Sequence, residues 1–429
     1  MTKFLYLLMI LSLMVVIGGC DDSEDISVPK HTPTYAVKMG GIFPFTGGMS
    51  DKGRPRHQGA LLAVKHLTEA GFPVGWFVAD SGTDPTTGVN AARDLIENGK
   101  VQVIIGAASS SVTIAIAEQV TIPNQVSQIS YSSTSPQITE LEADDGQDFL
   151  FRGVSSDALQ GVIAAREAFD KGYQRVSILY VNNSYGQGIK KDFTENFEAL
   201  GGTVVAAVPH EEKRGGDVEV EVSYLAELQQ AAKMNLPEGQ RPQALVAMSY
   251  KGHAVSYLRE AIDEKFFNQF FFVDGTRSDE IIKTVPELNG MCGTAHGWEE
   301  TESREIFKAT YREEYGEFPE VSYQSNSYDA VIIAGLAAYA VQAIGESITP
   351  ITIRDYLRRV NDPDGQKVMA GEDGLKRAMK MLDSGLTINY EGASGNVDFD
   401  DNGNVIAPIE IWCYEGGGIV HKENVQPNL

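Results

Sequence analysis

The sequence lacks the patterns that mark most metal, redox and hydrolytic sites. It has only three cysteines, with no C-x-x-C pair, and its seven histidines are scattered without the spacing of metal ligands. It contains no G-x-S-x-G, no H-E-x-x-H and no G-x-x-x-x-G-K-[ST]. We therefore expect no metal, no cofactor and no catalytic residues, and we expect a protein that is not an enzyme.

Positive charge is also scarce. The chain has 35 lysines and arginines against 59 aspartates and glutamates, which gives a formal net charge of −24. Nucleic acids and anionic lipid surfaces attract basic proteins, so this balance disfavours both as direct partners.

One long apolar run lies at the N-terminus, at 4–17, directly after Lys3. It is short for a membrane span and has the form of a signal peptide. The run ends in Ile17-Gly18-Gly19-Cys20, which resembles a bacterial lipobox whose cysteine becomes the lipidated N-terminus. We expect a signal peptide at 1–19 and a polar tether at 20–33. An ordinary signal peptide and a single membrane span are the alternatives.

The residues beside Cys20 bear on location and on disulfides. The two aspartates that follow it resemble the signal that retains Gram-negative lipoproteins at the inner membrane. If Cys20 carries lipid, Cys292 and Cys413 remain, an even number in an exported protein. One disulfide and two buried thiols both stay open for this pair.

Segments with strand and helix character alternate along the rest of the chain, which is typical of α/β proteins. The length exceeds what one hydrophobic core usually serves, so we expect two lobes. Expected strands include 36–43 and 76–80, and expected helices include 58–70 and 157–170.

Two expected turns are marked by their residues. The basic segment Lys52-Gly53-Arg54-Pro55-Arg56 reads as a turn before the first helix. Near the C-terminus, Asp400-Asp401-Asn402-Gly403 precedes an apolar strand at 409–412, and an Asp-Asn-Gly turn beside a strand suggests a hairpin.

Two consecutive strand-like runs, at 101–105 and 125–129, are each followed by a cluster of hydroxyl residues, Ser109-Ser110-Ser111 and Ser132-Ser133-Thr134. Open α/β sheets bind ligands outside the carboxyl ends of their strands, and the first cluster is expected at a helix N-terminus that attracts anions. No lysine lies in either loop, so a small neutral or zwitterionic solute is favoured over a phosphate. The alternative for Ser110 is an ordinary N-cap.

Further motifs extend these clusters into an ordered pattern from about Tyr35 to Tyr414. They are Pro44-Phe45-Thr46-Gly47, Phe151-Arg152, Asn182-Asn183-Ser184-Tyr185-Gly186-Gln187-Gly188, Phe272-Val273-Asp274-Gly275 and Gly395-Asn396-Val397-Asp398-Phe399-Asp400. Together with the two clusters, the pattern resembles the periplasmic branched-chain amino-acid-binding proteins, which are substrate-binding subunits of ABC importers.

The resemblance implies an α/β fold of two Rossmann-like lobes with parallel sheets, joined by a three-crossover hinge, the type I periplasmic-binding fold. The implied lobes are 34–155 with 297–395, and 156–296 with 396–429. The resemblance also implies a location on the periplasmic or extracytoplasmic face of the membrane. There the protein would capture an amino acid or a similar small molecule by hinge closure and deliver it to an ABC permease in the inner membrane.

The resemblance also assigns a ligand site. The hydroxyls would bind the ligand's carboxylate, the tyrosines would form an aromatic wall, and Asp274 would pair with the ammonium group. The matching residues are Ser110, Ser132, Thr134, Tyr185, Tyr250 and Asp274. These types fit the chemistry, because an α-amino acid needs an anion site beside an acceptor for its ammonium group. A turn-forming Asp-Gly and packing aromatics are the alternatives.

The chain departs from the family's usual pattern at three places, one of which is Tyr131, a bulky residue where proline is common beside the hydroxyl clusters. Asp274 stands where glutamate is common, and the basic turn at 52–56 stands where an aromatic residue often lines the pocket. A cation there would either pair with an acidic ligand side chain or lie solvated at the surface. An amide or a carboxylic acid is therefore an alternative ligand, and a ligand-sensing lipoprotein without transport is an alternative function.

Overall fold

The computed structural model describes residues 34–212 and 222–427, and those from Tyr35 onward belong to one structural unit, Tyr35–Leu429. The signal peptide, Cys20 and the tether expected at 1–33 lie outside the described residues. Within the described part of the chain, no helix is long and apolar enough to cross a membrane.

Five parallel strands form the first sheet, in the order β2-β1-β3-β4-β5. Their bounds are β1 Val37–Phe43, β2 Val74–Asp80, β3 Val103–Ile105, β4 Ser127–Ser130 and β5 Leu150–Arg152. The helices packed on this sheet include α1 Ser50–Glu69, α2 Pro85–Glu97, α3 Ser110–Ile116 and α10 Gln324–Ala343. Successive strand residues point to opposite faces, so Met39 and Phe43 contact the core under α1 and α10, whereas Ile42 contacts the core under α2 and α3.

Seven strands form the second sheet, in the order β14-β13-β10-β9-β8-β6-β7. Their bounds are β6 Arg175–Val181, β7 Thr203–His210, β8 Ala244–Met248, β9 Phe270–Phe272, β10 Cys292–His296, β13 Ile409–Glu415 and β14 Gly418–Val425. The strands from β10 to β7 pair in parallel, and β13 and β14 add an antiparallel edge.

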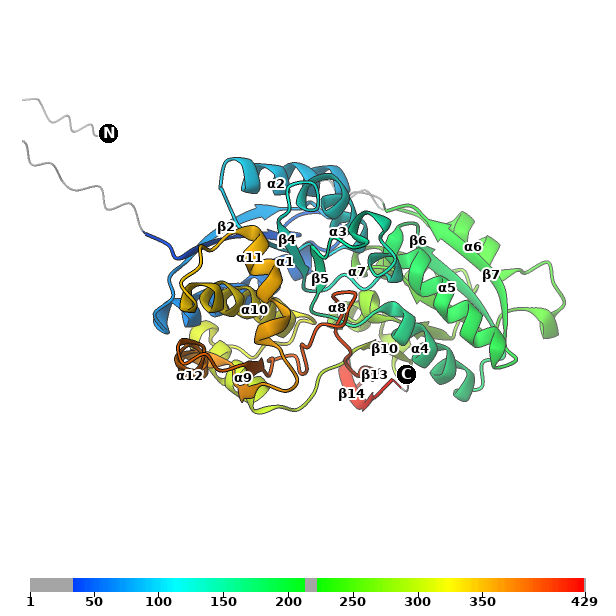
Figure 1. Cartoon of the computed structure of the whole chain (residues 1–429). Helices are drawn as coiled ribbons and strands as arrows, with labels where there is room; N and C mark the ends of the chain where they lie inside the picture. The colour runs from blue at the N-terminus through cyan, green and yellow to red at the C-terminus, as the bar shows by residue number, and fades with distance from the viewer. Residues whose placement is uncertain (1–33, 213–221, 428–429) are drawn as a thin grey trace, which may run out of the picture. The chain divides into compact units, whose positions relative to one another are not determined.

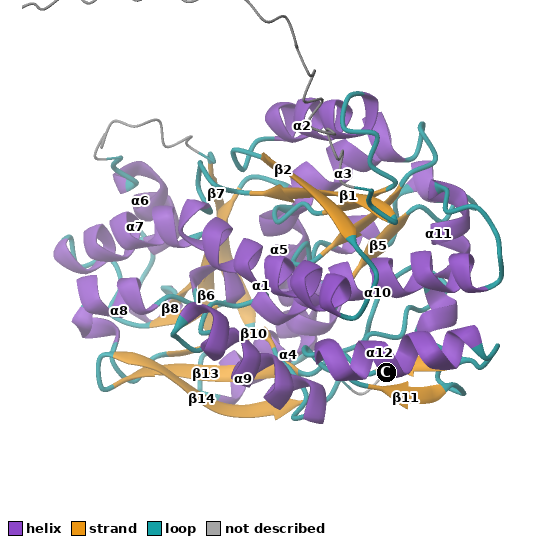
Figure 2. Ribbon diagram, turned by 90° about the vertical axis from the view of Figure 1, so that its left-hand side faces the viewer, coloured by secondary structure: helices purple, strands orange, loops and turns teal. Residues whose placement is uncertain are grey.

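Helices also cover both faces of the second sheet (Figure 2). On one face lie α4 Asp157–Asp170 and α5 Ser184–Ala199, and on the other lie α6 Leu225–Ala232, α7 Lys251–Asp263 and α8 Asp279–Thr284. Val246 and Phe271 pack toward the first pair, and Leu245 and Phe272 pack toward the second group.

The last third of the chain returns to the first sheet before it ends in the second (Figure 1). The remaining elements are α9 Glu302–Tyr315, α11 Pro350–Tyr356, α12 Gly371–Asp383 and a two-stranded parallel sheet of β11 Gln366–Val368 and β12 Ile388–Tyr390. The chain thus passes between the lobes after β5, after β10 and after β12. The expected fold of two Rossmann-like lobes with three crossovers is confirmed, while the exact lobe bounds given above stay a prediction.

The three crossovers contact one another. The Ser155 hydroxyl donates to the carbonyl of Ala407 at 3.2 Å and accepts from its N–H at 2.6 Å, and the N–H of Gly297 donates to the carbonyl of Pro408 at 2.8 Å. The buried Arg152 donates from Nε to Asn404 Oδ1 at 2.7 Å. These contacts join the three connections into one hinge region.

A disulfide links Cys292 to Cys413, directly opposite each other in the antiparallel pair of β10 and β13. The sequence left this pairing open. The two positions are 121 residues apart, and the chain that separates them builds much of the first lobe.

Two sequence-based expectations are wrong. Helix α1 begins at Ser50 rather than at 58, so Lys52 and Arg56 lie in a helix instead of a turn, and both side chains are buried rather than solvated at the surface. Proline inside a helix normally ends it. Here the first turns pack tightly, since a Cβ on Gly53 would come within 2.2 Å of the carbonyl of Pro44.

The C-terminal hairpin is also displaced from its expected position. It joins β13 to β14 through Gly416 and Gly417, both with positive φ, so the turn lies after the strand at 409–412 rather than before it. The Asp-Asn-Gly turn instead contacts the first crossover, where the carbonyl of Gly403 accepts from the N–H of Arg152 at 2.9 Å.

Candidate functional site

The six residues predicted for the ligand site line a single pocket. Each follows the carboxyl end of a parallel strand: Ser110 follows β3, Ser132 and Thr134 follow β4, Tyr185 follows β6, Tyr250 follows β8, and Asp274 follows β9. Because parallel strands in register end at the same edge of a sheet, loops far apart in sequence meet there. The first sheet supplies the hydroxyls, and the second supplies the tyrosines and the acid.

The hydroxyl loops are held by internal hydrogen bonds. Ser110 Oγ accepts from the N–H of Ser135 at 3.2 Å, and Ser132 Oγ donates to the carbonyl of Ala108 at 3.1 Å. The N-cap of α3 is Ser109, so the alternative that Ser110 is an ordinary N-cap is wrong.

Thr134 belongs to a buried chain of polar groups behind the pocket. Its Oγ1 donates to Asp157 Oδ2 at 2.7 Å, and Asp157 Oδ1 lies 3.3 Å from Nε2 of His296. Burial raises the pKa of the Asp157 carboxyl, and the contact with His296 opposes that rise. Asp157 is thus bonded to its neighbours behind the pocket and does not line the pocket itself.

Tyr185 and Tyr250 stack, with ring centroids 5.4 Å apart and planes 13° apart. The Tyr185 hydroxyl donates to Asp274 Oδ1 at 2.6 Å and accepts from the N–H of Gly275 at 3.1 Å. Burial, together with the neighbouring Asp274, raises the pKa of Tyr185 well above that of a free phenol, so the hydroxyl keeps its proton. The pair forms an aromatic wall with a fixed hydrogen-bond donor.

Asp274 accepts a second hydrogen bond, from the hydroxyl of Tyr323 to Oδ2 at 2.8 Å. Its carboxylate therefore faces the pocket, and the turn after β9 is held by Thr276, whose hydroxyl bonds the backbone of Val273. This arrangement does not support a purely turn-forming role for Asp274.

Sequence reasoning missed Tyr323. It precedes α10 and adopts a φ of 70°, a left-handed conformation that is uncommon for tyrosine and is concentrated at functional sites. No local motif marks it, because its partner Asp274 lies 49 positions earlier in the chain. Since Tyr323 belongs to the first lobe and Asp274 to the second, their hydrogen bond joins the lobes.

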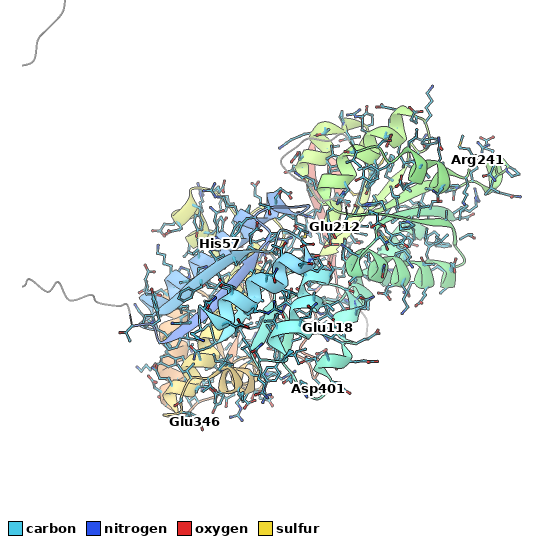
Figure 3. The ribbon with its side chains drawn as sticks, turned by 90° about the horizontal axis from the view of Figure 1, so that it is seen from above. His57, Glu118, Glu212, Arg241, Glu346 and Asp401 are labelled. Atoms are coloured by element: carbon cyan, nitrogen blue, oxygen red, sulfur yellow. A yellow bond between two sulfur atoms is a disulfide. The ribbon has the colours of Figure 1, made fainter. Side chains whose placement is uncertain are left out.

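Further contacts close the lobes over the pocket. The Ser135 hydroxyl donates to the carbonyl of Ser184 at 2.9 Å, and Ser109 Oγ lies 3.5 Å from the Tyr250 hydroxyl. Glu212 also lies where the lobes meet (Figure 3). The pocket measures only about 20 Å³, room for roughly one water. An amino acid therefore enters only when the lobes separate or these side chains rotate.

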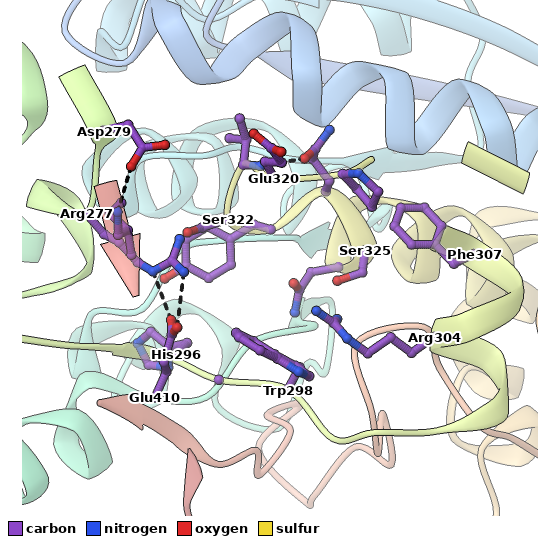
Figure 4. Close-up of a pocket in the computed structure, with 17 residues that line it drawn as sticks. Arg277, Asp279, His296, Trp298, Arg304, Phe307, Glu320, Ser322, Ser325 and Glu410 are labelled. Carbon is purple, nitrogen blue, oxygen red and sulfur yellow. Dashed lines mark hydrogen bonds and ion pairs between the residues drawn. The ribbon is translucent and has the colours of Figure 1, made fainter. Parts of the chain in front are cut away.

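Tyr323 also lines a larger cavity of about 370 Å³. Figure 4 shows this cavity. Its basic groups have partners: Arg277 Nε lies 2.9 Å from Glu410 Oε2, and the Arg304 guanidinium lies over the Trp298 ring at 4.5 Å. None of the hydroxyl loops reaches this cavity. Of these two spaces, only the small pocket is lined by the six predicted residues, and Tyr323 lines both.

A family model described as periplasmic binding protein matches residues 36–384. The chain belongs to the periplasmic binding protein family. This confirms the family expected from the sequence. Proteins of this family bind small-molecule ligands, work with ABC transporters and act outside the cytoplasm.

Among curated proteins, this periplasmic binding protein is similar to the chemotactic signal transduction system substrate-binding protein BasB of Halobacterium salinarum. The two are 26% identical over 375 residues, which is 84% of this chain and 83% of BasB.

Among solved structures, it is similar to the leucine binding protein LivK of Thermotoga maritima, with a TM-score of 0.72, 24% identity, and coverage of 91% of this chain and 99% of that chain. An ABC-transporter solute binding protein from R. palustris, solved with benzoate, has a TM-score of 0.70, 15% identity and coverage of 92% and 97%. These structures share the fold.

Proposed function

We propose that this protein captures a small solute carrying a carboxylate and an ammonium group between its two lobes and delivers it to an ABC permease. The observation that carries the proposal is the convergence of the six strand-end residues from both lobes on one pocket. Hydroxyls that suit a carboxylate stand on one side, and an acid that suits an ammonium group stands on the other. Neither lobe alone offers both.

Hinge closure follows from this division, because the solute makes its full set of contacts only when the lobes meet. The solute therefore favours the closed state. Without the solute, the lobes are linked by a few neutral and charge-assisted hydrogen bonds, such as that from the Tyr323 hydroxyl to Asp274.

We expect the protein to become more compact when its solute binds. Mass spectrometry of denatured protein would first identify the co-purified solute, and small-angle scattering would then compare stripped, refolded protein with and without it. The radius of gyration should decrease on binding. An unchanged radius at saturation would count against closure, and steady chemical conversion of the solute would favour an enzyme instead.

A sensing role without transport is the second candidate, because one similar protein, BasB, is named for a chemotactic signal transduction system. Deletion of the gene separates the two roles. Loss of solute uptake supports delivery to a permease, whereas normal uptake with a lost behavioural response supports sensing.

We also propose that the protein is lipid-anchored at Cys20 on the extracytoplasmic face of the inner membrane. The disulfide supports an oxidising compartment, where such bonds form and persist. Cys20→Ser should release the protein from the membrane fraction into the soluble fraction, because the several acyl chains of a lipoprotein hold it firmly. Wild-type protein that is already soluble would favour an ordinary signal peptide.

A further inference from the structure

Two basic side chains from one helix face are buried in the wall of the ligand pocket. Lys52 and Arg56 are four residues apart on α1, and their exposed fractions are 6% and 0%. Residues at this spacing are neighbours on a helix, where like charges repel, and burial makes a charge more costly. Such a pair therefore needs negative charge nearby.

The protein itself supplies only part of that compensation. Arg56 donates from Nη1 to Ser132 Oγ and from Nε to the carbonyl of Ser322, both at 3.1 Å, and lies over the Tyr323 ring at 4.8 Å. These partners are neutral. Among the described residues, no carboxylate forms an ion pair with Arg56 or Lys52, and none accepts a hydrogen bond from the Lys52 ammonium. Burial lowers the pKa of Lys52 to about 8.

Other acids near the pair are already engaged or lie outside the pocket. Asp274 accepts from two tyrosine hydroxyls, and Asp157 is bonded to Thr134 and His296. Asp51 is more exposed and faces Lys251 at 3.9 Å, outside the pocket lining. The pocket wall thus carries two cations and one carboxylate.

This count discriminates between classes of solute. A neutral amino acid leaves one cation of the wall uncompensated. A monocarboxylic acid balances the total charge but leaves Asp274 without a cationic partner. An amino acid with an acidic side chain presents two carboxylates and one ammonium group, which is the complement of Lys52, Arg56 and Asp274.

Building on the function proposed above, we infer that the solute is an acidic α-amino acid, with one carboxylate at Arg56 and the hydroxyl loops and the second at Lys52. Lys52 is then a specificity-determining residue. Its ammonium group distinguishes a side-chain carboxylate from an apolar side chain of similar size.

Calorimetric titration of stripped protein with L-glutamate, L-aspartate, L-leucine and benzoate tests the inference. One of the acidic amino acids should bind at least about tenfold more tightly than L-leucine. Lys52→Met keeps the length of the side chain and removes the charge, so it should weaken that binding about thirtyfold or more. The matched control is Arg54→Met on the exposed side of the same helix, which should leave binding unchanged.

The pH dependence gives a second readout. Above pH 8 unliganded Lys52 loses its proton, so binding a carboxylate there requires proton uptake, and affinity should fall by up to about tenfold per pH unit. The charged groups that face Lys52 are Asp51, Arg56, Asp274 and Arg277. Lys52→Arg should retain acidic-amino-acid binding and lose this pH dependence.

The possible failures are distinguishable. If L-leucine binds as tightly as the acidic amino acids and Lys52→Met changes neither, the inference is overturned and the proposed function stands. Binding of benzoate but of no amino acid overturns it in favour of a carboxylic acid. If no solute binds, none co-purifies and the radius of gyration never changes, the proposed function fails, and the inference with it.

Discussion

Replacing Asp274 with alanine should weaken binding of an amino-acid solute by about thirtyfold to several thousandfold, or roughly 2 to 5 kcal/mol. The variant would leave the ligand's ammonium group buried without a charged partner. It would also leave the hydroxyls of Tyr185 and Tyr323 without their acceptor, which destabilises the closed state further. Calorimetric titration with the identified solute measures the loss.

Two companion variants separate charge from hydrogen bonding. Asp274→Asn keeps the shape and one acceptor but removes the charge, so it should also weaken an amino acid. Tyr323→Phe removes one bond to Asp274 and keeps the charge, so it should cost only about 1 kcal/mol. If the solute has a carboxylate but no ammonium group, Asp274→Asn should strengthen binding, because it removes the repulsion between the Asp274 carboxylate and the carboxylate of the solute. Unchanged or tighter binding by a folded Asp274→Asn variant would therefore refute the ammonium assignment.

The order of strands and helices was largely predictable, because it depends on local patterns. Helix α4 begins and ends where the sequence indicates, and strands β1 and β2 differ from the expected ranges by one or two residues at one end. The start of α1 was not predictable. Gly53 and Pro55 disfavour a helix in isolation, and the helix exists because these residues pack against the loop after β1.

A contact between distant parts of the chain explains why the C-terminal hairpin was predicted at the wrong place. The turn at Asp400–Gly403 has the residues of a hairpin, but its partner is Arg152 at the end of β5 rather than the strand that follows the turn in sequence. The sheet of β11 and β12 was missed because each strand has only three residues. The helix between them, α12, was missed as well. Short strands carry little periodicity of their own.

The residues of the candidate site also divide into those that the sequence indicated and those that it did not. The two hydroxyl clusters were indicated by their positions after predicted strands, and the resemblance to the family supplied Tyr185, Tyr250 and Asp274. Tyr323 was missed. The basic segment at 52–56 was expected near the pocket, but its helix and the burial of Lys52 and Arg56 were not, because they result from packing between segments far apart in the chain. The i, i+4 spacing of the two cations was the available signal, and it has meaning only once the segment is known to be helical.

Removal of the disulfide with Cys292→Ser and Cys413→Ser should lower the free energy of unfolding by about 2 to 5 kcal/mol. The bond closes a loop whose ends are 121 residues apart, and the chain-entropy model gives about 5 kcal/mol for a loop of that length. The segment inside the loop contains α9 to α12 of the first lobe, whereas both cysteines lie in the second sheet. The bond therefore restricts the conformations that this segment can adopt in the unfolded chain.

Neither cysteine lines the ligand pocket, so the double variant should retain its solute affinity while its denaturation midpoint decreases. Treatment of the wild type with a reductant should reproduce the decrease, and the same treatment should leave the double variant unchanged. Loss of protection should be largest at β13 and β14 in hydrogen exchange, because the bond fixes this antiparallel edge to β10. A wild type whose midpoint is insensitive to reductant and equal to that of the double variant would contradict a stabilising role for this bond.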